Sequence, residues 1–404
     1  MRTRHFAFAP VWHHILPVLA LTMAACSETP IAGVDGSLQR ADAVKFWESN
    51  AAVYWNGVAR GMVVSHSSPA PVAIRGYAIV SVAQYNAAVA AEGGKVGNVH
   101  PSVRAAIAGA SVVALSFLYP GQASALEELL ESFLSSPAWP GDRNTDAAAG
   151  VAIGRAIAEQ VVARAQTDNF FTPGTVTVPV GPGIWSSSAP PVGALWGQAR
   201  TYFLLSGDQF RPPPPPAFGS PEFNAALEEV RQLSDTRTAE QVANAIFWDA
   251  PAGTQTPPGI WSEEAARLAV KYHLSERETA HVFALIHMVA FDAIVASHEA
   301  KYFYWLLRPS QADPAITTVI PLPNFPSYPS NHAAISAAMA AVLGAMFPAE
   351  KTRLEAWAEE AAFSRVLGGI HYRFDGDAGL TLGRKIAAWA LDHDVVGHQP
   401  FVLR

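Results

Sequence analysis

Three short blocks in the last third of the chain gather lysine, arginine, histidine and serine residues at fixed spacings. The blocks are Lys-Tyr-Phe-Tyr-Trp-Leu-Leu-Arg-Pro at 301–309, Tyr-Pro-Ser-Asn-His at 328–332 and Ser-Arg-Val-Leu-Gly-Gly-Ile-His-Tyr-Arg-Phe-Asp at 364–375. Cationic and imidazole side chains gathered this densely favour an anion between them. A fold that uses these residues together must bring three separated segments to one place.

Lys301 and Arg308 lie seven positions apart in the first block. If the aromatic and leucine run between them is helical, the two side chains project from one face, two turns apart. Pro309 is expected to end that helix, because a proline disfavours helical geometry in the residue before it and lacks a backbone N–H. Both basic groups could then reach one tetrahedral ligand, whereas either one alone would more often be a surface side chain.

Ser330 in the second block precedes an alanine-rich run, residues 333–347, that is expected to be helical. A serine in this position is a natural N-cap. The start of a helix offers unpaired backbone N–H groups and the positive end of the helix dipole. Ser330, Asn331 and His332 are therefore expected where a phosphate-like anion is best held.

His371 in the third block lies six positions after Arg365, with Gly368 and Gly369 between them. The two glycines indicate a helix end or a close approach of the backbone. Asp375, four positions after His371, could accept a hydrogen bond from one ring nitrogen and fix the tautomer. The other nitrogen would then be free to bind a metal centre or to attack phosphorus. Together the three blocks predict an oxyanion site.

This ordered set resembles the vanadium haloperoxidase and type 2 phosphatidic acid phosphatase (PAP2) superfamily. The superfamily pattern is Lys, six residues, Arg-Pro, then Pro-Ser-Gly-His, then Ser-Arg, five residues, His, three residues, Asp, and every spacing is met here. Asn331 stands where the family usually has glycine. Asparagine also supplies a backbone N–H toward the anion, but the exchange bears on the loop conformation and on the room beside the anion. A looser resemblance to bacterial haloperoxidase-type members extends to residues 247–249 and 257–261.

The resemblance implies an all-α fold of helical bundles and a site for vanadate, which phosphate can also occupy. The residues implied to hold vanadate are Lys301, Arg308, Ser330, Asn331, Arg365 and His371, with vanadium attached to His371. The residues implied in catalysis are His332, His371 and Asp375. Phe325 leads the loop before the second block, as in chloroperoxidase-type members, and is implied to line the substrate pocket.

Two activities are implied for this one site, because vanadate and phosphate share charge type and tetrahedral shape. The preferred one is a vanadate-dependent haloperoxidase, which oxidises halide with hydrogen peroxide while His332 acts as acid and base. The alternative is an acid phosphatase, in which His371 attacks a phosphomonoester to form a phosphohistidine and His332 protonates the leaving alkoxide. A non-catalytic protein that binds phosphate or vanadate is a further alternative.

The length and composition indicate a large buried core. The chain has 404 residues, of which 50% are hydrophobic and 15% are charged, and its formal net charge is -7. This acidic balance argues against general binding to nucleic acid or to anionic membranes, so the cationic cluster is expected to be a local feature. We expect an N-terminal helical half over residues 41–220 and a C-terminal catalytic half over residues 221–404. The sequence does not indicate an oligomeric state.

Apolar residues recur at helical spacing through most of both halves. Helices are expected at 43–63, 70–92, 101–119, 123–134, 145–166, 221–233, 239–248, 263–274, 275–297 and 380–391. Residues 168–220 interrupt this pattern with many Pro, Gly and Ser residues, and we expect a long ordered surface loop with a short hairpin at 175–180. This loop is either a structural strap or, through Trp185, Trp196 and Phe203, a wall of the anion site.

The N-terminus resembles a bacterial lipoprotein signal peptide over residues 1–25. It has a basic start, an apolar run from Ile15 and then the chain's single cysteine, Cys26. We expect a tether at 26–40 and export to the outer membrane or periplasm, with a lipid on Cys26 as the membrane attachment. Ordinary signal cleavage nearby and a retained anchor are the alternatives. No later run reaches the roughly 20 uninterrupted apolar residues that a membrane span needs.

Three further histidines, His281, His287 and His298, lie on one expected helical stretch and suggest a metal site. His281 and His287 would project about 240° apart on a helix, so they could not share one metal ion. Asp249 and Asp292 are candidates to orient the cationic cluster, with core or capping roles as the alternative.

Overall fold

The computed structural model describes residues 50–94, 100–135, 145–394 and 401. The chain divides into two units, Met1–Ile31 and Ala32–Arg404, and all described residues belong to the second. The expected signal peptide at 1–25, the lipidation site at Cys26 and the tether at 26–40 lie outside the described residues. These three features stay predictions.

The regular secondary structure of the described part of the chain is almost entirely helical, which confirms the all-α class. Its α-helices are α1 (Ala51–Ser65), α2 (Ala70–Gly93), α3 (Val103–Leu118), α4 (Ala123–Ser135), α5 (Ala147–Ala165), α6 (Pro221–Thr236), α7 (Ala239–Asp249), α8 (Thr256–Lys271), α9 (Glu276–Tyr304), α10 (Pro309–Ala312), α11 (Asn331–Met346), α12 (Lys351–Leu367) and α13 (Arg373–His393). Two short strands, β1 (His100–Pro101) and β2 (Thr145–Asp146), pair in parallel.

Several helices differ from the expected ranges, and for α8 and α12 the local reason is plain. α8 begins at Thr256 instead of residue 263 and carries Pro257 and Pro258 in its first turn. Proline is well tolerated there, because the first N–H groups of a helix have no partner within it. α12 was not expected as a separate helix, since its buried face mixes small and polar residues with only three large apolar ones, Leu354, Val366 and Leu367, and so gives a weak apolar pattern.

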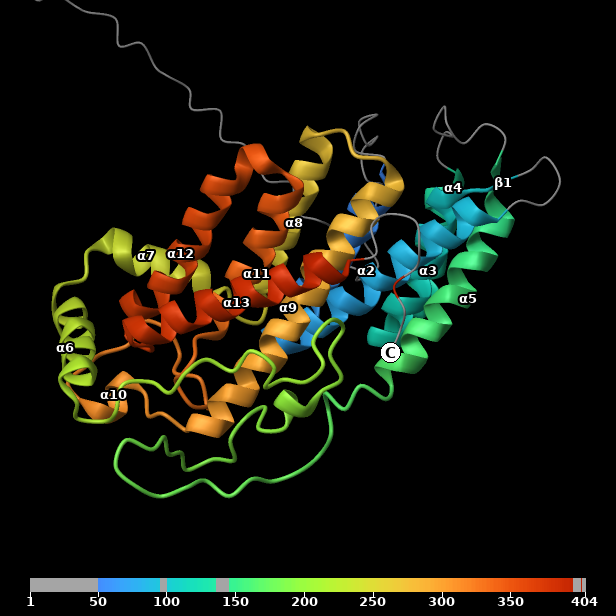
Figure 1. Ribbon diagram of the computed structural model, residues 1–404. Helices are drawn as coiled ribbons and strands as arrows, with labels where there is room; N and C mark the ends of the chain where they lie inside the picture. The colour runs from blue at the N-terminus through green and yellow to red at the C-terminus, as the bar shows by residue number, and fades with distance from the viewer. Residues whose placement is uncertain (1–49, 95–99, 136–144, 395–400, 402–404) are drawn as a thin grey trace, which may run out of the picture. The chain divides into compact units, whose positions relative to one another are not determined.

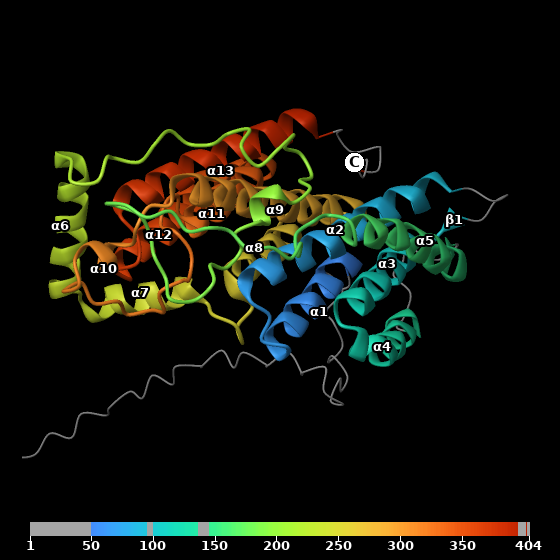
Figure 2. The same ribbon diagram turned by 90° about the horizontal axis from the view of Figure 1, so that it is seen from below.

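Helix α9 joins the two expected halves of the chain (Figure 1, Figure 2). It packs against α2 from the N-terminal half and against α11 and α13 from the C-terminal half. By length and composition alone α9 could cross a membrane, with a mean hydropathy of 1.7 over its most apolar window, but 94% of that window is buried inside the protein. Its apolar surface is therefore covered by neighbouring helices. The division between residues 220 and 221 stays a sequence-based prediction.

Two helix pairs, α3 with α5 and α11 with α13, are built from the same local parts. Ser102 caps α3 and Ser330 caps α11, and each serine follows a proline. The backbone N–H of Ser102 donates to the carbonyl of Asp146 over 3.0 Å, and that of Ser330 donates to the carbonyl of Asp375 over 2.9 Å. The chain thus carries one packing unit twice, and the second copy holds the second block and the end of the third.

Close contact within each pair depends on glycine. A Cβ on Gly154 of α5 would lie 2.0 Å from the carbonyl oxygen of Ala106, and a Cβ on Gly383 of α13 would lie 2.2 Å from that of Ala334. Helix backbones approach this closely only where one of them lacks a side chain. The packing of α13 on α11 therefore sets where Asp375 meets Ser330.

Residues 168–220 form the ordered loop that the sequence predicted, drawn in green in Figure 1 and Figure 2. The loop pairs with the connection between α9 and α11. Ile184 forms an antiparallel bridge with that connection, and the N–H of Val192 donates to the carbonyl of Asn324 over 2.9 Å. The expected hairpin at 175–180 is wrong, because that stretch forms no strand and the loop pairs with a distant segment instead of with itself.

Asp292 of α9 anchors this loop. Its buried carboxylate accepts the backbone N–H groups of Tyr202 at 2.7 Å, Phe203 at 2.8 Å and Leu204 at 3.0 Å. Hydrogen bonds to an ionised acceptor are stronger than neutral ones, so three of them hold the loop firmly. Of the two roles considered for Asp292, the structure supports the one in the core.

Replacing Gly383 with alanine is expected to lower the free energy of unfolding by about 1 to 3 kcal/mol, because the new methyl group overlaps the Ala334 carbonyl. Gly376→Ala on the same helix is the control, since a Cβ there meets Ala362 at an ordinary 3.7 Å. The control should keep its stability or gain up to about 1 kcal/mol from helix propensity. Urea denaturation followed by circular dichroism measures both, and equal stability of the two variants would contradict the close packing.

Candidate functional site

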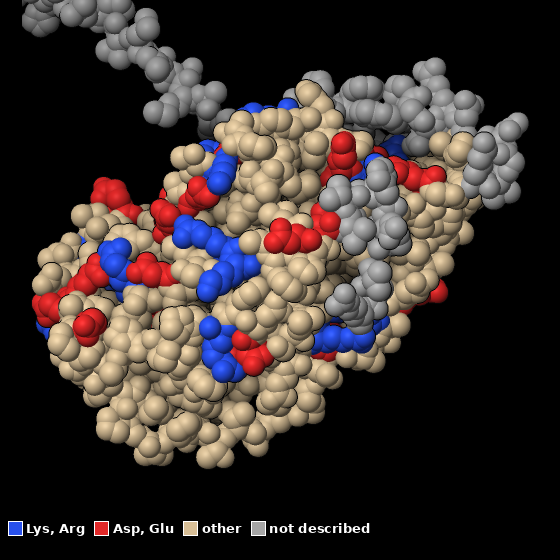
Figure 3. Space-filling model, viewed as in Figure 1, with Lys and Arg blue, Asp and Glu red and all other residues tan. Residues whose placement is uncertain are grey.

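The three blocks converge in the interior of the protein. Lys301, Arg308, Arg365 and Asp375 have no exposed surface, and His371 is 3% exposed. On the face shown in Figure 3, by contrast, basic and acidic side chains lie next to one another amid wide uncharged areas. The cationic cluster is thus an interior feature of an acidic protein.

Lys301 and Arg308 converge by a route that differs from the expected one. α9 ends at Tyr304, and Trp305 takes a left-handed conformation (φ 54°, ψ 30°) that turns the chain. Arg308 is extended, as favoured before a proline, and Pro309 begins the short helix α10 instead of ending a long one. The prediction of a single helical face is therefore wrong. A turn at Trp305, not helical spacing, brings the two cations together.

Both cations are held by backbone carbonyls of the loop before α11. The Lys301 ammonium donates to three carbonyls of residues 326–329. The Arg308 guanidinium donates to the carbonyls of Phe325 at 3.1 Å and Pro326 at 3.4 Å. Lys301 and Arg308 also lie 5.2 and 5.1 Å from the centre of the Phe325 ring, where a cation–π attraction adds to the hydrogen bonds.

The start of α11 lies at this loop, as predicted. Ser330 is the N-cap, and its Oγ accepts the Ala333 N–H over 3.4 Å. Asn331 and His332 are the first two residues of the helix, so their N–H groups have no carbonyl partner within it. His332 Nε2 lies 2.9 Å from the Trp248 carbonyl. Because a carbonyl can only accept, Nε2 carries the proton and Nδ1 is the basic atom.

His371 and Asp375 pair at the start of α13. Gly369 takes a left-handed conformation (φ 78°) after α12 and leads the chain to His371. Asp375 Oδ2 accepts from His371 Nδ1 over 2.7 Å and from the Tyr372 N–H over 3.2 Å. His371 Nε2 therefore keeps its lone pair and lies 3.2 Å from a terminal nitrogen of Arg308. The expected pair is present, formed across the first turn of a helix.

Arg365 is positioned by the end of α7. One terminal nitrogen lies 3.3 Å from Asp249 Oδ1, and the other donates to the Ala245 carbonyl over 2.6 Å. Asp249 therefore takes the orienting role that was considered for it. Because the neighbouring Trp248 carbonyl holds His332, one helix end positions two residues of the cluster.

The cluster carries excess positive charge. Among the described residues, the three cations Lys301, Arg308 and Arg365 have two carboxylates near them, Asp249 and Asp375. Burial lowers the pKa of Arg308 and of Arg365 to about 10. Burial and then the Arg308 charge lower the pKa of Lys301 as well. Cations, helix-start N–H groups and one imidazole lone pair form a donor set that fits a tetrahedral oxyanion.

Burial, together with the same charges, keeps both histidines neutral. Burial, followed by the charge of Arg365, lowers the pKa of His332 well below its ordinary value. Burial, followed by the charge of Arg308, does the same to the pKa of His371. Burial raises the pKa of Asp375 to about 6, so at neutral pH a carboxylate faces a neutral imidazole. That imidazole donates through Nδ1 and presents Nε2 as a nucleophile or metal ligand.

Two residues of the cluster were not predicted. Ser327 Oγ donates to Asp375 Oδ2 over 2.5 Å, and His298 Nε2 lies 3.1 Å from Asn331 Nδ2. Ser327 gave no signal, because a serine in a proline-rich loop is common. His298 lies three positions before Lys301 on α9, and that spacing places both on one helix face. The spacing was the signal that could have identified it.

The long loop was expected to be either a structural strap or a wall of the anion site, and its three aromatic residues divide between these roles. Trp185 and Phe203 make contacts typical of a strap, with the residue that follows α9 and with the C-terminal segment. The Trp196 ring packs against His298, with 4.7 Å between ring centres, and His298 packs against Phe325 at 5.2 Å. One aromatic residue of the loop, Trp196, therefore contacts the cluster through His298.

The other two histidines of α9 have separate partners. His281 Nε2 lies 3.0 Å from Asp394, whereas His287 Nδ1 lies 2.5 Å from Ser81 Oγ. Within the described ranges, no group of three or more His, Cys, Asp or Glu side chains is arranged to hold a metal ion.

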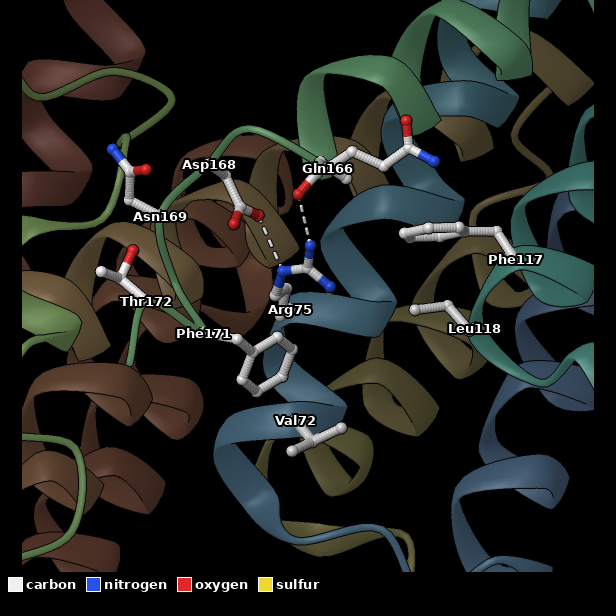
Figure 4. A pocket seen from close by; sticks show the side chains of 10 residues that line it. Val72, Arg75, Phe117, Leu118, Gln166, Asp168, Asn169, Phe171 and Thr172 are labelled. Atoms are coloured by element: carbon white, nitrogen blue, oxygen red, sulfur yellow. Dashed lines mark hydrogen bonds and ion pairs between the residues drawn. The ribbon is translucent and has the colours of Figure 1, made fainter. Parts of the chain in front are cut away.

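A separate pocket of about 540 Å³ lies among α2, the ends of α3 and α5 and the start of the long loop (Figure 4). Arg75 in its wall donates to Asp168 over 2.7 Å and to the Ala165 carbonyl over 2.6 Å. The charges of this wall are therefore paired with each other. None of the cluster residues lines the pocket.

Buried neutral histidines make this fold sensitive to acid. Burial lowers the pKa of His287 and His298 to about 3, and that of His332 and His371 also falls well below the ordinary value. In the unfolded chain each would bind a proton near pH 6.5. As the pH falls, the unfolded state therefore takes up more protons and stability is lost. Burial raises the pKa of Asp292 and Asp375 to about 6, which offsets part of this effect.

The free energy of unfolding is expected to fall by on the order of 3 kcal/mol between pH 7 and pH 5.5, because the unfolded state gains four histidine protons and the folded state gains up to two on carboxylates. Urea denaturation at a series of pH values measures this change. A stability that stays flat or rises over the range would show that the histidines are not held neutral.

Residues 281–393 match the PAP2 superfamily, and this stretch contains all three blocks. A non-specific acid phosphatase from Providencia stuartii is 31% identical over 174 residues, which are 41% of this chain and 66% of the phosphatase. The matched region thus spans slightly less than two thirds of that relative.

Solved structures share the fold over a larger part of the chain. A bacterial vanadium-dependent iodoperoxidase is similar with a TM-score of 0.72 and 24% identity, over 85% of this chain and 96% of the other. Apo-type and holo-type structures of a bacterial vanadium-dependent chloroperoxidase are similar with TM-scores of 0.65 and 15% identity, over 79% and 80% of this chain and 92% and 91% of theirs. The chain therefore shares the helical fold of these haloperoxidase structures, and its residues 281–393 match the PAP2 superfamily.

Proposed function

We propose that this protein is a vanadate-dependent haloperoxidase that oxidises halide ions with hydrogen peroxide. The observation that carries the proposal is the extent of the shared architecture. The likeness to the bacterial iodoperoxidase covers 85% of the chain, whereas the match to the acid phosphatase covers 41%. The shared fold therefore extends well beyond residues 281–393, the part of the chain that matches the PAP2 superfamily.

The residues proposed to hold vanadate have chemistry that suits it. The cations of Lys301, Arg308 and Arg365 and the N–H groups at the start of α11 suit its oxygens, and His371 Nε2 suits vanadium. When bound, vanadate supplies a Lewis acid that activates peroxide toward halide without a required change of oxidation state. Asp375 holds His371 in the tautomer that this bond needs.

His332 is the proposed acid and base. Its Nε2–H is held by the Trp248 carbonyl, so the neutral Nδ1 can take a proton from hydrogen peroxide and return it to the departing oxygen. Phe325, packed between His298 and the two cations, is the proposed wall of the substrate pocket.

An acid phosphatase is the second candidate, and the 31% identity to the Providencia enzyme favours it. In that reaction His371 Nε2 would attack the phosphorus of a phosphomonoester, and His332 would protonate the leaving alkoxide. The same cations would stabilise the charge of the transition state. The two candidates differ in whether vanadate is required or inhibitory.

The purified protein is expected to halogenate a phenol dye with peroxide and halide only after orthovanadate is added. His371→Ala should lower this rate about 100-fold or more, because the ligand for vanadium is lost. His66→Ala, which changes an exposed histidine at the end of α1, is the control and should keep full activity. Hydrolysis of an aryl phosphate that vanadate suppresses, with no halogenation under chloride, bromide or iodide, would replace the first candidate by the second.

His332→Ala is expected to reduce turnover by about 100- to 10,000-fold, since the proton acceptor is removed. Its affinity for vanadate should change little, because the His332 side chain is bound to the Trp248 carbonyl and not to the anion-holding cations. Steady-state kinetics and vanadate titration of the same preparation separate the two effects. Full turnover in this variant would place the proton transfer on another residue.

A further inference from the structure

Asn331 stands where the superfamily pattern has glycine. The orientation of its side-chain amide is set by a neighbouring histidine, His298. His298 is fully buried, with Nδ1 3.1 Å from the Gly193 carbonyl and Nε2 3.1 Å from Asn331 Nδ2. A carbonyl only accepts, so His298 Nδ1 donates to Gly193. Burial, followed by the Lys301 charge, lowers the pKa of His298 to about 3, so the ring is neutral and Nε2 accepts. The Asn331 NH₂ group is therefore the donor to His298.

This orientation leaves the other end of the amide without a partner. Asn331 Oδ1 is buried and accepts no hydrogen bond from the described chain. A buried polar atom without a partner costs free energy, and native structures contain few of them. A buried acceptor of this kind indicates a ligand that can donate to it.

The residue that carries this unpaired oxygen lies at the edge of the oxyanion site. Asn331 is the first residue of α11. The backbone N–H groups of the first turn of a helix have no carbonyl partner within the helix. The partner of Asn331, His298, packs on the Phe325 ring, over which Lys301 and Arg308 are placed. The cations and N–H groups of this site are donors, so Asn331 Oδ1 adds an amide acceptor to the two imidazole lone pairs, on His332 Nδ1 and His371 Nε2.

We propose that Asn331 Oδ1 accepts a hydrogen bond from a protonated oxygen of the bound anion, and that it thereby selects protonated tetrahedral oxyanions over fully deprotonated ones. Hydrogen phosphate and hydrogen vanadate carry such a proton, whereas sulfate at neutral pH carries none. A sulfate oxygen would face the amide oxygen with no proton between them, which disfavours its binding. The inference rests on the proposed oxyanion site, but not on which of the two reactions takes place there.

His298 is the positioning residue for this selection, and it links the site to the long loop. Gly193 and Trp196, both in the loop, hold the imidazole by a hydrogen bond and by ring packing. Without the His298 nitrogen, the Asn331 amide would be free to turn its NH₂ group toward the anion. The loop thus acts on anion choice through one imidazole.

Isothermal titration calorimetry of the full chain with inorganic phosphate and with sulfate tests the proposal at about pH 8, where both anions are divalent. The native protein should bind phosphate at least about 10-fold more tightly than sulfate, because one unpaired buried acceptor costs this much in affinity. In Asn331→Gly and Asn331→Ala, phosphate affinity should fall about 10-fold while sulfate affinity stays or rises. Asn224→Ala, at an exposed position on α6, is the matched control and should keep the native ratio.

His298→Phe keeps an aromatic ring against Trp196 and Phe325 but removes both nitrogens, and it should lower the phosphate-to-sulfate ratio to a similar extent. A native ratio in this variant would overturn the role of His298. A native ratio in both Asn331 variants, with folding verified by circular dichroism, would overturn the proposal itself. Absence of phosphate binding to the native protein would overturn the oxyanion site as well. The protein could show neither halogenation nor phosphate hydrolysis and still have a phosphate-to-sulfate affinity ratio that depends on Asn331. That result would support the proposed anion selection and would contradict only the proposed function.

Discussion

The interior of this protein holds three basic side chains, Lys301, Arg308 and Arg365, with two carboxylates near them, and the rest of the site depends on that imbalance. A buried charge costs several kcal/mol unless it is paired or hydrogen-bonded. Backbone carbonyls of residues 325–329 meet this cost for Lys301 and Arg308, and Asp249 meets it for Arg365. Carbonyl dipoles stabilise a cation without cancelling its charge, so a positive potential remains in the interior. A chain with a net charge of -7 can therefore attract an anion to one buried point.

The helical scaffold around this point occurs twice, but only one copy carries the chemistry. Ser102 and Ser330 cap their helices in the same way, and each donates its backbone N–H to the carbonyl of an aspartate at the start of the partner helix. Asn331 and His332 follow Ser330, whereas Val103 and Arg104 follow Ser102. The packing unit is therefore compatible with an anion site without creating one. The side chains placed on it decide the function, as is general for folds that support several activities.

Local features of the fold were predictable, and features that depend on distant contacts were not. The N-cap at Ser330, the pair of His371 with Asp375 and the position of most helices follow from residue type and spacing within a few positions. The route from Lys301 to Arg308 was not predictable, because it depends on a left-handed turn at Trp305 that is held against the long loop. The hairpin expected at 175–180 failed for the same reason, since the loop pairs with the segment after α9.

The sequence by itself determined the cluster residues that belong to the three blocks, because their chemistry and spacing are properties of the chain. Ser327 and His298 were recognised as members only in the folded chain. Only the tertiary structure decided how they are oriented. The carbonyl that sets the tautomer of His332 lies 84 positions away in the sequence, and the one that sets the tautomer of His298, and so the amide of Asn331, lies 105 positions away. Hydrogen bonding depends on proximity in space, so which atom donates and which accepts is settled only when the folded chain brings these carbonyls to the imidazoles.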